Sequence, residues 1–279
     1  MLELLRNFGL PSVAASTQGP AIDNILSIVH WLMLILFVGW GAYFIYALIR
    51  FRSSNNHEAD YHGVRSHFSS YIEGAVAVIE IVLLFAFAFP IWASRVNDVP
   101  KGLDAVQIRV VAQQFAWNIH YPGPDGVFGK TSADLVDEVE NPIGLDRSDT
   151  FAKDDVFTIN QLHIPVNTPI NISLSSKDVI HSFTLNELRV KQDAIPGMEI
   201  PVWFEATMTT EEFLKTTIGT GREGKGFEIA CAQLCGLGHY RMKGFMTIHD
   251  DEGYAAWHEE QQEYLAEEED DDDWGDDDW

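Results

Sequence analysis

The sequence has 279 residues, of which 46% are hydrophobic, and this allows one or two domains with a real core. The formal net charge is −24, but sixteen acidic residues lie between Asp250 and Trp279 with no Lys or Arg among them. Without these sixteen the net charge is −8, an ordinary acidic surface. Nucleic acid is therefore excluded as a partner, because phosphate binding requires concentrated positive charge. No CxxCH motif occurs, which excludes a covalently attached c-type haem.

Two long apolar segments occupy the first third of the chain. The first runs from about 25 to 49 and is interrupted only by His30, and the second runs from about 74 to 93 and contains Pro90. At about 1.5 Å per residue, the first segment can cross a hydrocarbon core of about 30 Å with some tilt. A buried core helix is the alternative for either segment, but both exceed the usual length of one. We predict two membrane-spanning helices within residues 1–98.

The polar segment between the two spans predicts their orientation. It opens with Arg50 and Arg52 and carries Arg65, whereas the N-terminal flank has only Arg6. Loops rich in Lys and Arg stay in the cytoplasm, so both termini should face outward. We expect a two-span protein of the bacterial inner (plasma) membrane, with its N- and C-termini on the periplasmic side.

From Ala105 the sequence changes to short alternating runs rich in β-branched and aromatic residues. The runs cover residues 105–121, 156–162, 168–176, 179–188, 200–208, 224–230 and 243–249. They predict an antiparallel sandwich or barrel over residues 99–250, with the polar stretch 123–155 as a long loop or insertion. Residues 252–266 have helical spacing, so the last segment, 251–279, should be a helix followed by the acidic tail.

One cluster near the C-terminus carries candidate metal ligands. The segment CAQLCGLGHYRM places Cys231, Cys235, His239 and Met242 within twelve residues. Soft sulfur ligands with imidazole select copper, zinc or iron–sulfur chemistry. Met is a poor zinc ligand, and a blue-copper site leaves the second Cys without a role. Two thiolates can instead bridge two copper ions. A disulfide between the cysteines is the alternative, but it leaves His239 and Met242 unexplained.

A two-copper site needs a second histidine from elsewhere in the β-rich region. His181 is the best candidate, because it lies in the strand-like run DVIHSF, fifty residues before Cys231. The other histidines of this region, His120, His163 and His249, are expected to be surface or satisfied strand residues.

The whole chain resembles subunit II of cytochrome c oxidase. The landmarks are DVIHSF, KQDAIPGM at residues 191–198, and CAQLCGLGHYRM. The resemblance implies a two-helix transmembrane hairpin followed by an all-β cupredoxin-like Greek-key barrel, here with a C-terminal helix and acidic tail. It also implies a dinuclear copper centre (CuA) and no haem on this chain. The implied ligands are His181, Cys231, the backbone carbonyl of Gln233, Cys235, His239 and Met242.

The resemblance further implies a function in a proton-pumping oxidoreductase. Cytochrome c, or a tethered cytochrome c domain, would reduce the copper pair, and the electron would pass to haem in subunit I, where oxygen is reduced to water. Subunit I and other oxidase subunits would be partners, and association with a quinol-oxidising complex is left open. A quinol oxidase subunit of the same fold is disfavoured, because that branch lacks the copper ligands. A membrane-anchored copper delivery or storage protein is the alternative.

Two positions depart from the family pattern. Many members have Glu where this chain has Gln233, and that carboxylate also ligates magnesium at the boundary with subunit I. An amide is a weaker ligand for a hard cation, so a magnesium site is left open. Phe115 stands where the family has its electron-entry tryptophan, and Trp117 follows two residues later. Both are candidates for electron entry, with ordinary strand packing as the equal alternative.

Two carboxylates belong to the second apolar segment. Glu73 and Glu80 are seven residues apart and so lie nearly on one helix face. Ionisable residues inside a span are costly and usually functional. In the family, a Glu seventeen residues before the Pro of the second span lies at the mouth of a proton channel, and counting back from Pro90 gives Glu73. Glu80 is expected to be a hydrogen-bonded helix-contact residue.

The acidic tail has two interpretations. It is either a solvated, solubilising segment or a source of negative field that steers a basic cytochrome c towards the copper centre.

Overall fold

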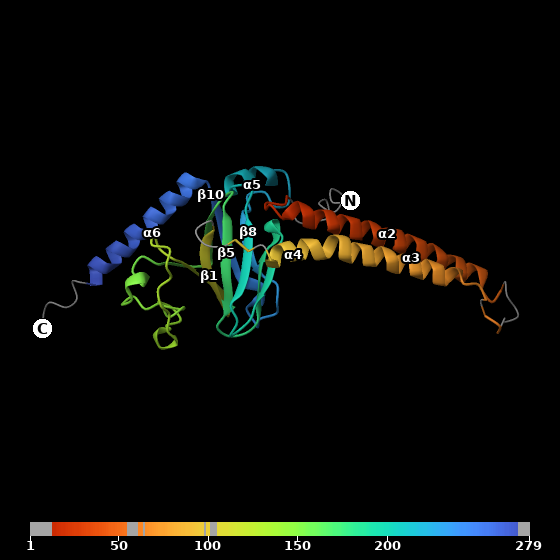
Figure 1. Ribbon diagram of the computed structural model, residues 1–279, viewed down its shortest axis with the longest axis horizontal. Helices are drawn as coiled ribbons and strands as arrows, with labels where there is room; N and C mark the ends of the chain where they lie inside the picture. Colours follow the sequence, from red (N-terminus) through yellow and green to blue (C-terminus); the bar gives the residue numbers. More distant parts are fainter. Residues whose placement is uncertain (1–12, 55–60, 64, 98, 101–104, 273–279) are drawn as a thin grey trace. The chain divides into compact units, whose positions relative to one another are not determined.

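The computed structural model describes residues 13–54, 61–63, 65–97, 99–100 and 105–272, the side chains of 268–272 excepted. Two apolar helical segments form one compact unit (Figure 1). The β domain forms the other, and it includes both the short segment before the first helix and the C-terminal helix. The described parts of residues 99–250 and 251–279, which were predicted as separate segments, therefore belong to the same compact unit.

The helical unit contains α2 (Gly19–Arg50) and a second segment made of α3 (Phe68–Leu83), the π-helical turn η1 (Leu84–Ala88) and α4 (Phe89–Asn97). Both segments are long and apolar enough to cross a membrane, and both extend beyond the predicted limits of 25–49 and 74–93. Pro90 accounts for the wide turn. It has no N–H to donate to the carbonyl of Ala86, and the N–H of Phe89 bonds instead to Leu84, five residues back.

The β domain is a sandwich of two five-stranded sheets with its apolar core between them, as the resemblance implied. One sheet has the order β3-β2-β1-β5-β8 and the other the order β4-β10-β9-β6-β7. Buried and part-buried residues alternate along β5, the pattern of a strand with one face on the core. The strands of the first sheet are β1 (Val106–Gln113), β2 (Ala116–Tyr121), β3 (Val156–Ile159), β5 (Pro169–Ser176) and β8 (Ile200–Glu205). Those of the second are β4 (Gln161–Pro165), β6 (His181–Leu185), β7 (Val190–Ala194), β9 (Phe227–Cys231) and β10 (Lys243–His249).

Most neighbouring strands pair antiparallel, as predicted, but β1 pairs with β5 in parallel and β4 pairs with β10 in parallel. Asn160 interrupts the predicted run 156–162 with a left-handed backbone, φ 60°. Its side-chain Oδ1 accepts a hydrogen bond from the Trp117 N–H at 2.8 Å. The chain crosses here from one sheet to the other, so β3 and β4 belong to different sheets.

One strand and one α-helix of the described residues were not predicted. Strand β7 has only one apolar side chain before Ala194, so its alternation is weak. Helix α5 (Thr210–Thr217) carries a capping box, in which Thr209 and Glu212 bond each other's backbone N–H. That pattern of Thr followed by Glu three residues later was a readable signal. The insertion 123–155 is irregular apart from two short 3₁₀ turns, as predicted.

His120 anchors this insertion to the sheet. The imidazole is buried, and its Nε2 lies 2.6 Å from Oδ2 of the buried Asp155. The same carboxylate oxygen accepts the Gly129 N–H at 2.8 Å, and the guanidinium of Arg147 donates to the Asp155 carbonyl at 3.0 Å. His120 is therefore a satisfied strand residue, which is one of the two outcomes the sequence predicted.

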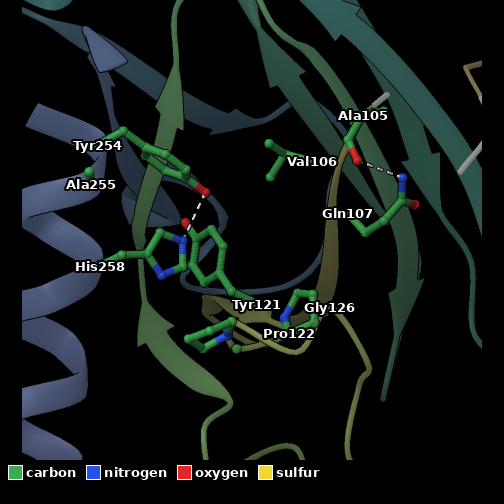
Figure 2. Close-up of a pocket in the computed structure, with 11 residues that line it drawn as sticks. Ala105, Val106, Gln107, Tyr121, Pro122, Gly126, Tyr254, Ala255 and His258 are labelled. Carbon is green, nitrogen blue, oxygen red and sulfur yellow. Dashed lines mark hydrogen bonds between the residues drawn. The ribbon is translucent and has the colours of Figure 1, made fainter. Parts of the chain in front are cut away.

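The C-terminal helix α6 (Asp251–Asp272) is longer than predicted and packs on β4 and β10. Trp257, which is 8% exposed, stacks on His163 with ring centroids 4.5 Å apart and an interplanar angle of 3°. The Nδ1 of His163 lies 2.9 Å from Nε2 of His249, so both predicted strand histidines are satisfied. A neighbouring cavity of about 770 Å³ is lined by Tyr254 and His258, and the Tyr254 hydroxyl lies 3.1 Å from His258 Nε2 (Figure 2).

Candidate metal centre

Two paired strands bring the first ligands together. His181 opens β6 and Cys231 closes β9, and the antiparallel register places Phe183 opposite Cys231. Side chains two residues apart share a face, so His181 and Phe183 point the same way. Nδ1 of His181 consequently lies 3.9 Å from Sγ of Cys231, although fifty residues separate them in the chain.

The loop after β9 supplies the remaining predicted ligands. Sγ of Cys235 lies 3.8 Å from Sγ of Cys231, 3.6 Å from Nδ1 of His239 and 3.7 Å from Sδ of Met242. Sδ of Met242 in turn lies 3.2 Å from Nδ1 of His181. The Gln233 carbonyl oxygen lies 3.2 Å from Sγ of Cys231. The structure thus gathers every predicted ligand into one cluster, with both cysteines as free thiols.

Two glycines allow this loop to fold closely against the turn between β1 and β2. Gly236 has φ +132°, in the region that L side chains rarely adopt. A Cβ on Gly238 would overlap the ring of Phe115. The ligand loop therefore depends on the absence of side chains at these two positions.

Asp178 orients His181. Its Oδ1 lies 2.8 Å from His181 Nε2, which must be the donor because an ionised carboxylate only accepts. In the neutral imidazole, Nδ1 is then free of hydrogen and faces the sulfur atoms, as a metal ligand must. Burial alone would raise the pKa of Asp178, but hydrogen bonds from His181 and from the Gln114 and Val179 N–H groups lower it.

The Cys235 thiol holds its proton tightly in the metal-free protein. Burial, together with the neighbouring Cys231 thiol, raises the pKa of Cys235 to about 11. A metal ion must therefore displace a proton when it binds. The ligand atoms of His181, Cys231 and Cys235 lie within 4.8 Å of one another. Two thiols, two imidazoles and a thioether are soft donors, and this set fits copper.

The two aromatic residues predicted for electron entry differ in their surroundings. Trp117 is fully buried, with its ring centroid 6.2 Å from that of His181 and 5.4 Å from that of Phe183. Phe115 is only partly buried, and the Arg241 guanidinium lies 5.9 Å from its ring centroid. Strand packing accounts for the position of Trp117, and a role for either residue in electron entry stays a prediction.

Sequence reasoning missed an exposed apolar surface on the ligand loop. Leu234 is 81% exposed, Leu237 98% and Tyr240 80%. Large apolar side chains gathered at a functional site mark a surface for another protein. Their position inside CAQLCGLGHY, between ligands, was the available signal.

Glu73 lies in the second turn of α3 and is exposed within the helical unit. It lines a cavity of about 550 Å³ together with Trp40 and Tyr43 of α2 and Phe68 of α3. Glu80, two turns further along α3, is also exposed. The roles predicted for these carboxylates stay predictions.

Comparisons of the sequence with known proteins identify one family. Residues 106–248 match the family model described as cytochrome c oxidase subunit II, periplasmic domain. The "alternative cytochrome c oxidase subunit 2" of Bradyrhizobium diazoefficiens is 30% identical over 246 residues, covering 88% of this chain and 82% of the relative. The cytochrome c oxidase subunit 2 of Cereibacter sphaeroides is 27% identical over 278 residues, covering 92% and 83%. Among solved structures, the periplasmic domain of subunit II (CoxB) of Bradyrhizobium japonicum is 27% identical with a TM-score of 0.39, covering 60% of this chain and 99% of that one.

Proposed function

Because this chain belongs to the cytochrome c oxidase subunit II family, we propose that it is the electron-entry subunit of a haem–copper terminal oxidase. The observation that supports this proposal most directly is a set of side-chain contacts of 3.2–3.9 Å. These contacts link His181, Cys231, Cys235, His239 and Met242. With the Gln233 carbonyl, these residues would hold a dinuclear copper centre. Bound copper supplies reversible one-electron exchange, and the chain makes no covalent bonds to a substrate.

The protein residues have four tasks in this proposal. The thiolates of Cys231 and Cys235 hold the metal, and Asp178 keeps Nδ1 of His181 directed at it. The buried Trp117 and Phe183 rings exclude water from one side of His181. The exposed Leu234, Leu237 and Tyr240 give the loop an apolar surface on which subunit I or the electron donor can dock close to the metal.

Copper content and spectroscopy of the purified full-length chain test the proposal. We expect two copper ions per chain, near-infrared absorption, and an electron paramagnetic resonance signal from one electron shared by both ions. Cys235→Ser should abolish this signal, whereas His258→Asn, which removes an imidazole outside the cluster, should preserve it. A single-copper blue spectrum in the wild-type protein would refute the relay.

The donor, partners and location follow from the same proposal. Cytochrome c, free or tethered, would deliver electrons on the outer face, and haem in subunit I would receive them. The excess of Arg between the spans supports a cytoplasmic loop and periplasmic termini in a bacterial inner membrane. The amide of Gln233 would make a magnesium site weak at this position.

Glu73 is proposed as the proton-entry carboxylate of the helical unit. Its exposure beside the cavity lined by Trp40 and Tyr43 supports access to a proton path from the cytoplasmic end of α3. Glu73→Gln removes the ionisable group at nearly constant shape and should slow proton uptake on reduction of the oxygen-binding centre. Glu80→Gln is the matched control at the next position on that face. An unchanged rate of proton uptake in Glu73→Gln would contradict the assignment.

A membrane-anchored copper delivery or storage protein is the second candidate function. The exposed apolar loop supports docking in either case. The two candidates differ in the fate of the metal, because a delivery protein must release copper to an acceptor and a relay must keep it through many cycles of reduction. Retention of both copper ions over repeated reduction and oxidation favours the relay.

A further inference from the structure

Gln114 supplies no predicted ligand, yet it contacts both ligand-bearing segments. It lies in the turn between β1 and β2. Its backbone N–H donates to Oδ2 of Asp178 at 2.6 Å, and its side-chain Nε2 donates to the Cys235 carbonyl oxygen at 2.6 Å. The first contact reaches the segment before β6, and the second reaches the loop after β9. One residue therefore holds two segments that are far apart in the chain.

The hydrogen bond from Gln114 to Asp178 is linked through the Asp178 carboxylate to the imidazole of His181. Oδ2 of Asp178 accepts from Gln114, while Oδ1 lies 2.8 Å from Nε2 of His181. A second strand contact supports the same segment, because the Lys177 N–H donates to the Ala112 carbonyl at 3.0 Å. The end of β1 thus fixes the carboxylate that fixes the orientation of His181.

The second contact fixes the peptide of a thiol ligand. The amide of Gln114 bonds the Cys235 carbonyl, and the next residue, Gly236, packs so closely that a Cβ there would lie 2.6 Å from Nε2 of Gln114. Phe115 packs in the same manner against Gly238. The loop carrying Cys235 and His239 consequently packs against Gln114 and Phe115, the two residues of this turn.

We propose that Gln114 is a positioning residue of the copper centre, which joins the His181 segment to the Cys235 loop and so sets the separation of these ligands before metal binds. The inference rests on the proposed function. Ligands held in place by supporting hydrogen bonds bind metal more tightly, because less ordering is required when the metal arrives. Losing the side-chain bond should therefore loosen the Cys235 loop while leaving the sandwich intact.

Gln114→Met tests the side chain alone, because it keeps the length and the backbone N–H but removes the donor. In the copper-loaded full-length chain in detergent, we expect a copper chelator to remove metal about fivefold faster, the change corresponding to one lost hydrogen bond. The hyperfine pattern of the copper signal should also change. Gln114→Glu, which turns the donor into an acceptor facing a carbonyl, should release copper faster still.

Gln113→Met is the matched control. The Gln113 side chain accepts a hydrogen bond from Asn118 Nδ2 at 3.1 Å, so the control loses a bond of the same kind beside the same turn. We expect its release rate and spectrum to equal those of the wild type, and the thermal unfolding of both metal-free variants to stay close to wild type. Equal effects in the two Met variants, or wild-type behaviour of Gln114→Met, would overturn the inference. Absence of the two-copper signal from the wild-type chain would instead refute the proposed function.

Discussion

Asp178 acts on the candidate centre through the ring of His181. The carboxylate bonds Nε2 and leaves Nδ1 directed at the sulfur atoms of Cys231 and Met242. Such partners of ligating histidines set both the tautomer and the basicity of the imidazole. The pKa of Asp178 is lowered, so the group is a carboxylate at neutral pH and accepts the hydrogen bond from Nε2.

Asp178→Asn should weaken copper binding without unfolding the domain. The amide keeps the shape but loses the negative charge, and removal of such a partner costs roughly 10–100-fold in metal affinity. Competition with a chelator of known affinity measures the change. Asp193→Asn, in strand β7 at the residue paired with Ser182, is the control. Equal copper affinity in wild type and Asp178→Asn would contradict a role for the carboxylate.

The candidate ligand residues could be grouped from the sequence, but the residues that support them could not. Cys231, Cys235, His239 and Met242 are close in the chain, so spacing alone groups them. His181 required the resemblance or a strand argument. Gln114 and Asp178 belong to residue types that are common on surfaces, and only the folded positions of two loops make them neighbours of the ligands. Contacts over such separations are set by sheet pairing, which spacing does not reveal.

At the scale of elements, α6 is held to the sandwich by stacked rings that can titrate. Burial, and then the neighbouring His249, lowers the pKa of His163 from 6.5 to about 4, and burial lowers the pKa values of His249 and His258. Asp250 is the charged group that opposes this effect at His249. Each of these imidazoles is therefore easier to protonate in the unfolded chain than in the folded protein.

The free energy of unfolding should fall as the pH falls from about 6.5 to about 4. Above this window His163 is neutral in both states, and within it the unfolded chain binds the proton first, so acid favours unfolding. His163→Phe keeps an aromatic partner for Trp257 and removes the titration, so it should flatten the pH dependence. Urea unfolding of the full chain at pH 7.5 and pH 4.5, which straddle most of this window, measures the effect. If the free energy of unfolding of His163→Phe depended on pH as strongly as that of the wild type, the prediction would be contradicted.

The elements were predicted as far as their side-chain patterns allowed. The apolar helices and most strands have strong periodicity, so their existence was predicted correctly. The order of strands within the sheets could not be predicted from the sequence. The chain passes from one sheet to the other at Asn160, and this depends on one left-handed residue and on its hydrogen bond to Trp117. Helix α6 was predicted too short because an acidic sequence has no apolar stripe to mark its end.

At the scale of the whole molecule, negative charge is concentrated at the C-terminus. Residues 273–279 lie outside the described residues, and α6 reaches Asp272. Deleting residues 267–279 should slow turnover with a basic cytochrome c at low salt by roughly tenfold, since a field of opposite sign raises the encounter rate. The difference should vanish at high salt because exposed charges are then screened.

A second variant replaces the acidic residues within 267–279 by Asn and Gln. It distinguishes the effect of the tail's charge from the effect of its length. It should behave like the deletion if the tail steers the donor. Wild-type salt dependence in both variants would leave the tail as a solubilising segment. Steady-state turnover across a range of ionic strengths supplies the measurement.

The order of the strands also dictates when during synthesis the metal cluster can form. His181 opens the sixth strand of the β domain, but Cys231 comes at the end of β9, and β9 lies between β6 and β10 in its sheet. The loop carrying the thiols is complete only at Met242, with β10 and α6 still to follow. A nascent chain therefore carries both thiols only in its last stage, and the cluster can assemble only after nearly the entire β domain has been synthesised.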